Sequence, residues 1–210
     1  MEIEVFQDTV CPWCRIGKRH LQLALEQWDG ERPTVRYRSF FLNPGIPPEG
    51  YEFRPYMQAK LGDRIPLDQL FARPTQAGAQ VGLTFNFDRV ARMPNTELSH
   101  RLIKLAPEEQ RAALLDDVYA AYFEHGQDIG ALEVLLELGA RRGMDRAQLE
   151  AQLRGDAARD EVLADISEAR ELGISGVPFF VLDGRYGISG AQPPAVLLEA
   201  LQMASRPEAA

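Results

Sequence analysis

The hydrophobic positions at the start of the chain predict a strand, a helix and a second strand. Residues 3–6 form a short apolar run, and the amphipathic stripe that follows it ends near Asp29 and Gly30. At residues 34–42 apolar and polar side chains alternate, which indicates a second strand. Because a helical crossover of this kind normally joins parallel strands, we expect the two strands to be parallel.

The middle of the chain is predicted to be helical. Three prolines and two glycines interrupt the first pattern at residues 43–50. From about residue 53 to residue 172 the apolar positions recur with a helical period. Helix starts are indicated at Pro66, Asn95, Pro107, Ile129, Asp145 and Ala157. We therefore expect residues 51–172 to form an inserted, all-helical domain.

Strand patterns return near the C-terminus. Residues 179–182 are a nearly continuous apolar run, which is typical of a buried central strand. Asp183-Gly184 is a turn signal, and residues 185–189 would form the returning strand ahead of a final helix. The two ends together have the order β-α-β and β-β-α. We therefore predict an α/β thioredoxin fold, formed by residues 1–50 and 173–210 and interrupted by the large helical insertion.

Composition and charge narrow the class of partner. A chain of 210 residues with 45% hydrophobic and 26% charged residues is ordinary for a globular protein. Its net charge of −8 and pI near 5.0 argue against nucleic acid as the main partner, because phosphate binding needs a basic surface. No apolar run approaches the length of a membrane span, and the N-terminus lacks the pattern of a secretory signal. We therefore expect a cytoplasmic protein without a membrane partner.

The candidate chemistry lies in the motif Cys11-Pro12-Trp13-Cys14, which stands between the first predicted strand and the first predicted helix. This order places Cys11 at the start of the helix, where unpaired N–H groups and the helix dipole favour a thiolate. Cys14 follows within one helical turn, close enough to attack a mixed disulfide formed at Cys11. Pro12 suits the first turn of the helix, because proline has no N–H group that would need a hydrogen-bond partner there.

Three other interpretations of the two cysteines are half of a zinc site, a structural disulfide, and a pair of buried inert thiols. Zinc usually takes four ligands, and the chain has no second cysteine pair and no suitable spacing among His20, His100 and His125. A disulfide across three residues closes almost no loop and would stabilise little. The proline in the turn argues against inert thiols. We therefore expect redox or glutathione-type chemistry and no metal.

Several motifs along the chain carry a resemblance to a known family. They are Cys11-Pro12-Trp13-Cys14, Phe41-Leu42-Asn43-Pro44, Asn95-Thr96 with His100-Arg101-Leu102, Gly173-Ile174 with Gly176-Val177-Pro178, and Gly190-Ala191-Gln192. With these motifs the chain resembles the DsbA-like thioredoxin superfamily, and most closely its FrnE-like branch. The resemblance spans essentially the whole chain.

The resemblance implies a role for each predicted site residue. Cys11 corresponds to the attacking thiol and Cys14 to the resolving thiol. Pro178 matches the cis-proline that faces the dithiol in these folds, although the residue alone would favour a trans bond. Such a loop leaves the backbone of Val177 free to pair with an extended peptide or with glutathione. Pro12 and Trp13 complete the predicted substrate-binding residues, with Trp13 as an exposed aromatic side chain at a peptide-binding surface.

The chain departs from the pattern of the superfamily at two positions. Thioredoxins usually keep a buried acid six residues before the first cysteine, and this chain has Val5 at that position. The nearest carboxylates are those of Asp8 and Glu4. The sequence therefore leaves open which group accepts the proton of Cys14. DsbA has a histidine at the position of Trp13, so we expect a less oxidising protein. We expect the helix N-terminus, with Arg15 or Lys18, to stabilise the Cys11 thiolate. We expect His100 to be a surface or half-buried helical residue; the alternative is a role near the active site.

These observations lead to one main hypothesis and two alternatives. The main hypothesis is a thiol–disulfide oxidoreductase, with or without isomerase activity, that acts on protein or peptide disulfides. It would bind no cofactor and would use glutathione or a thioredoxin-type protein as its reductant. The first alternative is a glutathione-dependent isomerase or kappa-like glutathione transferase on the same fold, although those proteins typically carry serine where Cys11 stands. The second is a non-catalytic holdase chaperone that binds clients on the helical insertion.

Overall fold

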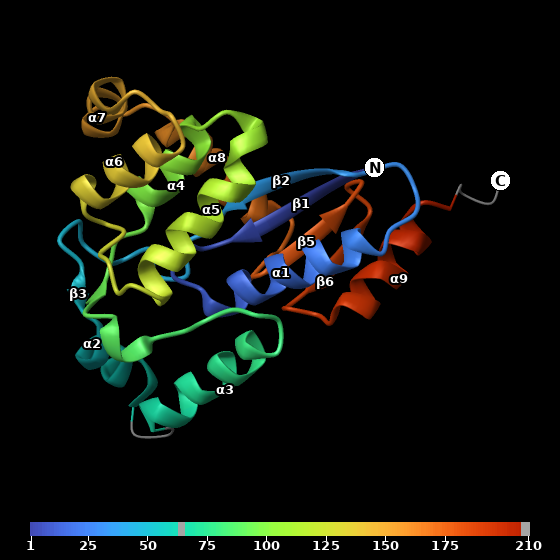
Figure 1. Ribbon diagram of the computed structural model, residues 1–210, viewed down its shortest axis with the longest axis horizontal. Helices are drawn as coiled ribbons and strands as arrows, with labels where there is room; N and C mark the ends of the chain where they lie inside the picture. The colour runs from blue at the N-terminus through green and yellow to red at the C-terminus, as the bar shows by residue number, and fades with distance from the viewer. Residues whose placement is uncertain (63–65, 207–210) are drawn as a thin grey trace.

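A four-stranded mixed sheet organises the fold in the computed structural model, which describes residues 1–62 and 66–206 (Figure 1). The strand order is β2-β1-β5-β6. The bounds are Glu2–Gln7 for β1, Thr34–Ser39 for β2, Phe179–Leu182 for β5 and Tyr186–Ser189 for β6. β1 pairs with β2 in parallel, whereas β5 runs antiparallel to both β1 and β6.

Side chains of the central strands alternate between the two faces of the sheet. Ile3 and Val5 belong to the hydrophobic cluster that includes residues of α1 (Pro12–Glu26) and α9 (Pro194–Ala204), two helices that pack side by side. Phe6 belongs instead to a second cluster, which includes Ala169 of α8 (Arg159–Glu171). Because a strand has a period of two residues, neighbours in β1 reach opposite layers.

The order of elements confirms the predicted thioredoxin fold. β1, α1 and β2 form the β-α-β part, and β5, β6 and α9 form the β-β-α part. The first two strands are parallel, as the helical crossover predicts. The predicted strands are slightly too long: the second ends at Ser39 instead of residue 42, and the returning strand begins at Tyr186. The predicted C-terminal part includes residues 207–210, which lie outside the described residues.

The insertion is mainly helical, and a short strand pair accompanies its helices. The helices that precede α8 are α2 (Phe53–Leu61), α3 (Leu67–Ala79), α4 (Glu97–Leu105), α5 (Glu108–Phe123), α6 (Leu132–Arg141) and α7 (Arg146–Arg154), with a 3₁₀ turn at Phe87–Arg89. In addition, β3 (Tyr51–Glu52) pairs antiparallel with β4 (Arg92–Met93). Strands of two residues are too short to produce an alternating pattern, so the description of the insertion as all-helical omits them.

Two predicted helix caps are close to those in the structure. Asp145 caps α7, and its side chain accepts a hydrogen bond from the Gln148 N–H at 2.7 Å. The cap of α4 is Thr96 instead of the predicted Asn95. The Asn95 side chain nevertheless accepts a hydrogen bond from the Glu97 N–H at 2.9 Å, so it still satisfies a donor at the start of that helix.

Buried contacts join the insertion to the sheet. One hydrophobic cluster includes both Val5 of β1 and Tyr119 of α5. On the other face of the sheet the buried Asp165 of α8 accepts a hydrogen bond from the Ser39 N–H at 2.7 Å. The same carboxylate lies 3.1 Å from Arg38 of β2 and 2.5 Å from Lys104 of α4. The helices therefore pack onto the thioredoxin-like part through apolar and ionic contacts.

Candidate active site

Cys11 is the N-cap residue of α1. Its backbone is extended, and its sulfur accepts a hydrogen bond from the N–H of Cys14 at 3.3 Å. The Cys11 N–H donates to the carbonyl oxygen of Asp8 at 3.0 Å, which holds the loop before the helix in place. Both cysteines are free thiols. The structure therefore places the Cys11 sulfur at the donor end of a helix, where a thiolate is stabilised.

The two thiols differ in their surroundings. Cys14 lies inside the first turn of α1 and is 1% exposed, compared with 3% for Cys11. Burial, reinforced by the neighbouring Cys11, raises the pKa of Cys14 well above its ordinary value. The surroundings of Cys14 therefore favour its protonated form.

The Val177-Pro178 loop lies beside the dithiol. The peptide bond between these two residues is cis, as the resemblance to the superfamily implies. The Cys11 sulfur lies 3.6 Å from the carbonyl oxygen of Val177. Helix α1 packs closely on this loop, because a Cβ atom added at Gly17 would lie 2.9 Å from the Pro178 ring. The fold thus brings the loop before β5 to the N-terminus of α1.

Pro12 and Trp13 border an apolar cavity of about 170 Å³ between the dithiol motif and the insertion. Trp13 is 40% exposed, as predicted, and Pro12 is half-buried. The other residues that line the cavity are Val10, Phe53, Met57, Leu70, Phe71, Pro74, Phe87, Met93 and Phe123. Sequence analysis missed these residues because a helical apolar stripe by itself indicates only a core face.

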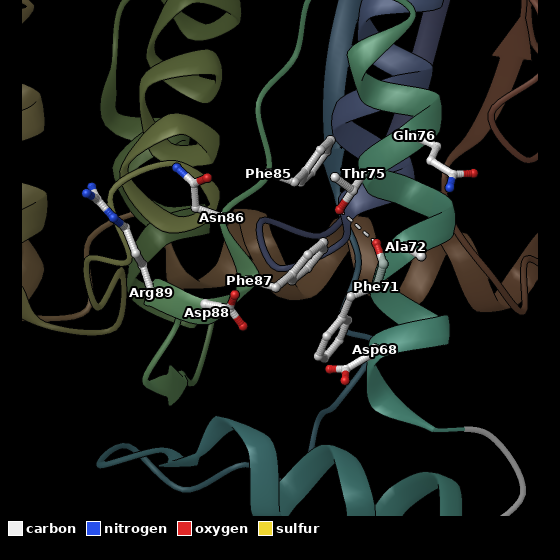
Figure 2. Close-up of a pocket in the computed structure, with 10 residues that line it drawn as sticks. All are labelled: Asp68, Phe71, Ala72, Thr75, Gln76, Phe85, Asn86, Phe87, Asp88 and Arg89. Atoms are coloured by element: carbon white, nitrogen blue, oxygen red, sulfur yellow. Dashed lines mark hydrogen bonds between the residues drawn. The ribbon is translucent and has the colours of Figure 1, made fainter.

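A larger open hollow of about 570 Å³ adjoins this cavity, and Phe71 and Phe87 line both (Figure 2). The two rings stack with their centroids 4.5 Å apart. Figure 2 shows Phe71 on α3 and Phe87 on the facing segment, with the carboxylates of Asp68 and Asp88 close to them. The aromatic rings therefore separate an apolar cavity next to Trp13 from a more polar hollow.

The charges of Arg15 and Lys18 are engaged by other groups, contrary to our expectation that one of them supports the Cys11 thiolate. Arg15 donates to the carbonyl oxygen of Thr84 at 2.7 Å and pairs with Glu124. Lys18 lies 2.6 Å from Asp116 of α5, and burial lowers the pKa of its ammonium group. Both side chains point into the contact with the insertion, which sequence spacing along α1 does not reveal.

His100 is not a surface residue: it is 1% exposed, and its Nε2 atom lies 3.3 Å from Oδ1 of Asp8. The prediction was wrong because α4 packs against the loop that precedes Cys11. In the same contact the hydroxyl groups of Thr9 and Ser99 lie 2.8 Å apart. Asp8 is also 1% exposed, and its Oδ2 atom accepts the Leu42 N–H at 2.8 Å.

Of the two carboxylates considered in the sequence, only Asp8 lies close to the dithiol. Val5 is buried in β1 at the position where thioredoxins usually keep an acid. Glu4 is adjacent to Val5 and therefore points to the opposite face of the sheet, where it pairs with Arg38.

The family comparison agrees with this fold. Residues 2–202 match the family described as DSBA-like thioredoxin domain, so the chain belongs to that family. This membership supports a disulfide oxidoreductase or isomerase activity in general. The more specific resemblance to the FrnE-like branch stays a prediction.

Three individual proteins illustrate the relationship. The chain is 36% identical to a probable DsbA oxidoreductase from Streptomyces coelicolor; the match covers 100% of this chain and 93% of that one, with a TM-score of 0.89. It is 27% identical to the uncharacterized protein YwbO from Bacillus subtilis (strain 168), over 96% of each chain. The cytosolic disulfide reductase DsbM from Pseudomonas aeruginosa, in a structure with GSH, is 23% identical over 97% of this chain and 98% of that one. Its TM-score of 0.68 shows a shared fold.

Two further observations concern residues 1–62 and 66–206. No helix there is both long and apolar enough to cross a membrane. No group of three or more histidine, cysteine, aspartate or glutamate side chains in this part of the chain could hold a metal ion.

Proposed function

We propose that this protein is a thiol–disulfide oxidoreductase that acts on protein or peptide disulfides, with Cys11 as the attacking thiol and Cys14 as the resolving thiol. The observation that carries the proposal is the asymmetry of the dithiol. The Cys11 sulfur caps the N-terminus of α1, whereas Cys14 lies inside the first turn, where burial raises the pKa of its thiol. Helix N–H groups favour a thiolate at the first position, and burial favours a thiol at the second.

The proposed reaction consists of two exchanges, written here for reduction of the client. The Cys11 thiolate attacks one sulfur of the client disulfide, the client S–S bond breaks, and the first client sulfur leaves and takes up a proton. Cys14 then loses its proton and attacks the Cys11 sulfur of the mixed disulfide. The second client sulfur leaves, so the client gains two thiols while Cys11 and Cys14 become a disulfide.

Two features next to the dithiol support an extended, partly apolar client. The backbone of Val177 lies beside the Cys11 sulfur, in the loop just before β5, where an extended peptide can add main-chain hydrogen bonds. The cavity of about 170 Å³ next to Trp13 is lined almost wholly by apolar side chains. A large apolar side chain close to the client cysteine fits these surroundings.

The dithiol has to be reduced again after each turnover, and we propose glutathione or a thioredoxin-type protein as the reductant. The similarity to DsbM, a cytosolic disulfide reductase whose structure was determined with GSH, supports this choice and a cytoplasmic location. Trp13 stands where DsbA has a histidine, which favours a less oxidising dithiol. No protein-bound cofactor is needed, because both electrons reside on the two sulfur atoms.

The experiment that tests the proposal is trapping of a mixed disulfide with a peptide or protein disulfide, followed on non-reducing gels. Cys14→Ser should accumulate a covalent adduct that a reductant releases, because Cys11 can attack but nothing resolves the product. Cys11→Ser is the matched control and should trap little. Adducts on Cys11→Ser but not on Cys14→Ser would reverse the assignment.

Two further outcomes would favour the alternative functions. A double Cys→Ser variant that protects clients from aggregation as well as wild type does would support the holdase. Glutathione-dependent isomerisation of a hydroxychromene carboxylate that survives Cys14→Ser would support the isomerase.

A further inference from the structure

A small polar cavity of about 170 Å³ lies at the outer edge of the sheet, apart from the two hollows beside Trp13. β2 is an edge strand, and its residues 35–38 line the cavity. Consecutive residues of a strand belong to opposite faces, so a cavity that all four of them line follows the edge of the strand. Lys104 of α4, Glu108 and Arg111 of α5 and Glu161 of α8 complete the lining.

The outer edge of β2 has backbone N–H groups that β1 does not use. Successive N–H groups of a strand point to opposite sides. Thr34 and Phe40 donate theirs to carbonyl oxygens on the β1 side. Those of Arg36 and the other even-numbered residues point the same way, so the N–H groups of Val35 and Tyr37 point away from β1. The cavity lies on this outer side.

One carboxylate of the protein already occupies this edge. The Ser39 N–H, which points to the same side, donates to the Asp165 carboxylate at 2.7 Å. That carboxylate also lies 3.1 Å from Arg38 and 2.5 Å from Lys104, and it is 2% exposed. A strand N–H, a guanidinium group and an ammonium group together therefore bind one oxyanion here, and the protein supplies that oxyanion from α8.

The neighbouring stretch of the same edge has similar donors but no carboxylate that neutralises them. Arg111 is half-buried and donates to the carbonyl oxygens of Ala106 and Lys104 at 3.1 and 2.8 Å. It forms no ion pair among residues 1–62 and 66–206, and a guanidinium group has further N–H donors to offer. Arg36 is half exposed and lies 3.3 Å from Glu2, which makes a weak pair.

We propose that this cavity binds a small oxyanion, a phosphate or carboxylate group, between the edge of β2 and Arg111. The anion accepts hydrogen bonds from the N–H groups of Val35 and Tyr37. It also accepts charge-assisted hydrogen bonds from the guanidinium groups of Arg36 and Arg111. The inference goes beyond the proposed function and does not depend on it, because no residue of the dithiol motif lines the cavity.

The two carboxylates in the lining limit the affinity, because Glu108 and Glu161 repel an anion. Glu161 is exposed and forms no ion pair within the described parts of the chain, so Glu161→Gln removes a charge without disturbing a contact. This variant should bind the anion more tightly than wild type. A cavity with a purely structural role predicts no such gain.

The experiment is a titration followed by the backbone amide resonances in NMR spectra. Inorganic phosphate and acetate are the two probes, and sodium chloride keeps the ionic strength constant. The resonances of Val35 and Tyr37 should shift along a saturating one-site curve, whereas that of Ser39, already bonded to Asp165, should shift less. Saturation by either probe supports the inference, and the tighter probe identifies the group.

Substitutions at the edge of the sheet test the donors. Arg36→Gln should weaken binding by about tenfold, near the low end for a hydrogen bond to a charged group because the side chain is 50% exposed. Arg111→Lys keeps the charge but loses the planar fork, so it should also weaken binding. The matched control is Arg141→Gln, which changes a 65% exposed arginine of α6 outside the cavity and should leave the affinity unchanged.

The competing explanation is that charged side chains on an edge strand only discourage pairing with another chain, a role that needs no ligand. It predicts no saturable shift with either probe, or equal effects of Arg36→Gln and Arg141→Gln. Either result would overturn the inference, as would weaker binding in Glu161→Gln. Cys11→Ser should bind the probes as wild type does, so a failure of the proposed thiol chemistry leaves this result unaffected.

Discussion

The Cys11 sulfur lies 3.6 Å from the carbonyl oxygen of Val177, although 166 residues separate the two positions. The register of the sheet explains this contact. Phe6 at the end of β1 pairs with Phe179 at the start of β5, so the loop after β1 and the loop before β5 emerge at the same edge. The antiparallel pairing thus places the proposed client-binding backbone next to the proposed nucleophile.

The burial of Cys14 predicts unequal reactivity of the two thiols. In Cys14→Ser, Cys11 should be alkylated readily near neutral pH. In Cys11→Ser, Cys14 should react slowly and accelerate only at alkaline pH, because burial is the main reason for its raised pKa and remains in the variant. The measurement is the rate of alkylation against pH for each variant. Faster reaction of Cys14 near neutral pH would contradict the assignment of the nucleophile.

Trp13 is predicted to bind clients without contributing much to stability. Trp13→Ala should raise KM for a peptide disulfide with an apolar residue beside its cysteine, and the KM for a small disulfide should not change. The free energy of unfolding should change by no more than about 0.5 kcal/mol, because the side chain is 40% exposed. Met203→Ala removes a similarly exposed side chain from α9 and is the control. Equal effects of both substitutions on KM would refute a specific role.

The Lys18–Asp116 pair is predicted to respond asymmetrically to substitution. Lys18→Met should change the free energy of unfolding by about 1 kcal/mol or less, because an apolar side chain avoids burying a charge. Asp116→Asn should cost more, about 2 kcal/mol, since it leaves the buried ammonium group without its carboxylate; the half exposure of Asp116 limits the loss. Denaturant unfolding of the two variants measures both. A larger loss for Lys18→Met would contradict the argument.

The same lysine predicts a pH dependence. Burial lowers the pKa of Lys18 in the folded protein below its ordinary value of 10.5. Between the two values the unfolded chain binds more protons, so the folded state gains stability as the pH rises through this window. Wild type should therefore gain stability relative to Lys18→Met at alkaline pH. Parallel pH profiles of the two proteins would contradict the lowered pKa.

Asp165 is predicted to be the most important ionic contact between α8 and the sheet. Asp165→Ala leaves the Ser39 N–H and Lys104 without their acceptor and removes one partner of Arg38, which should cost about 3–5 kcal/mol. Glu168→Gln changes a 40% exposed carboxylate 3.7 Å from the same arginine, and it should cost less than about 1 kcal/mol. Thermal or denaturant unfolding measures both. Similar losses would show that burial does not distinguish the two carboxylates.

The motif, the helix that follows it and the order of the strands were predictable because each depends on residues close together in the chain. A strand has a period of two residues and a helix a period near 3.6, so hydrophobic spacing alone distinguishes them. The position of Cys11 at a helix N-terminus is equally local. The short β3–β4 pair escaped prediction because two residues per strand do not establish a period.

The surroundings of the dithiol were decided by the packing of helices that are distant in the sequence. The amino-acid pattern of α4 shows a histidine but does not show that this helix buries His100 against Asp8. It likewise does not reveal that Arg15 and Lys18 pair with acidic residues of the insertion, or that Phe71 and Phe87 form a cavity next to Trp13. Burial, charge pairing and cavities are properties of surfaces brought together in three dimensions. The sequence therefore determined the two thiols and their local backbone, whereas the tertiary structure decided which side chains surround them.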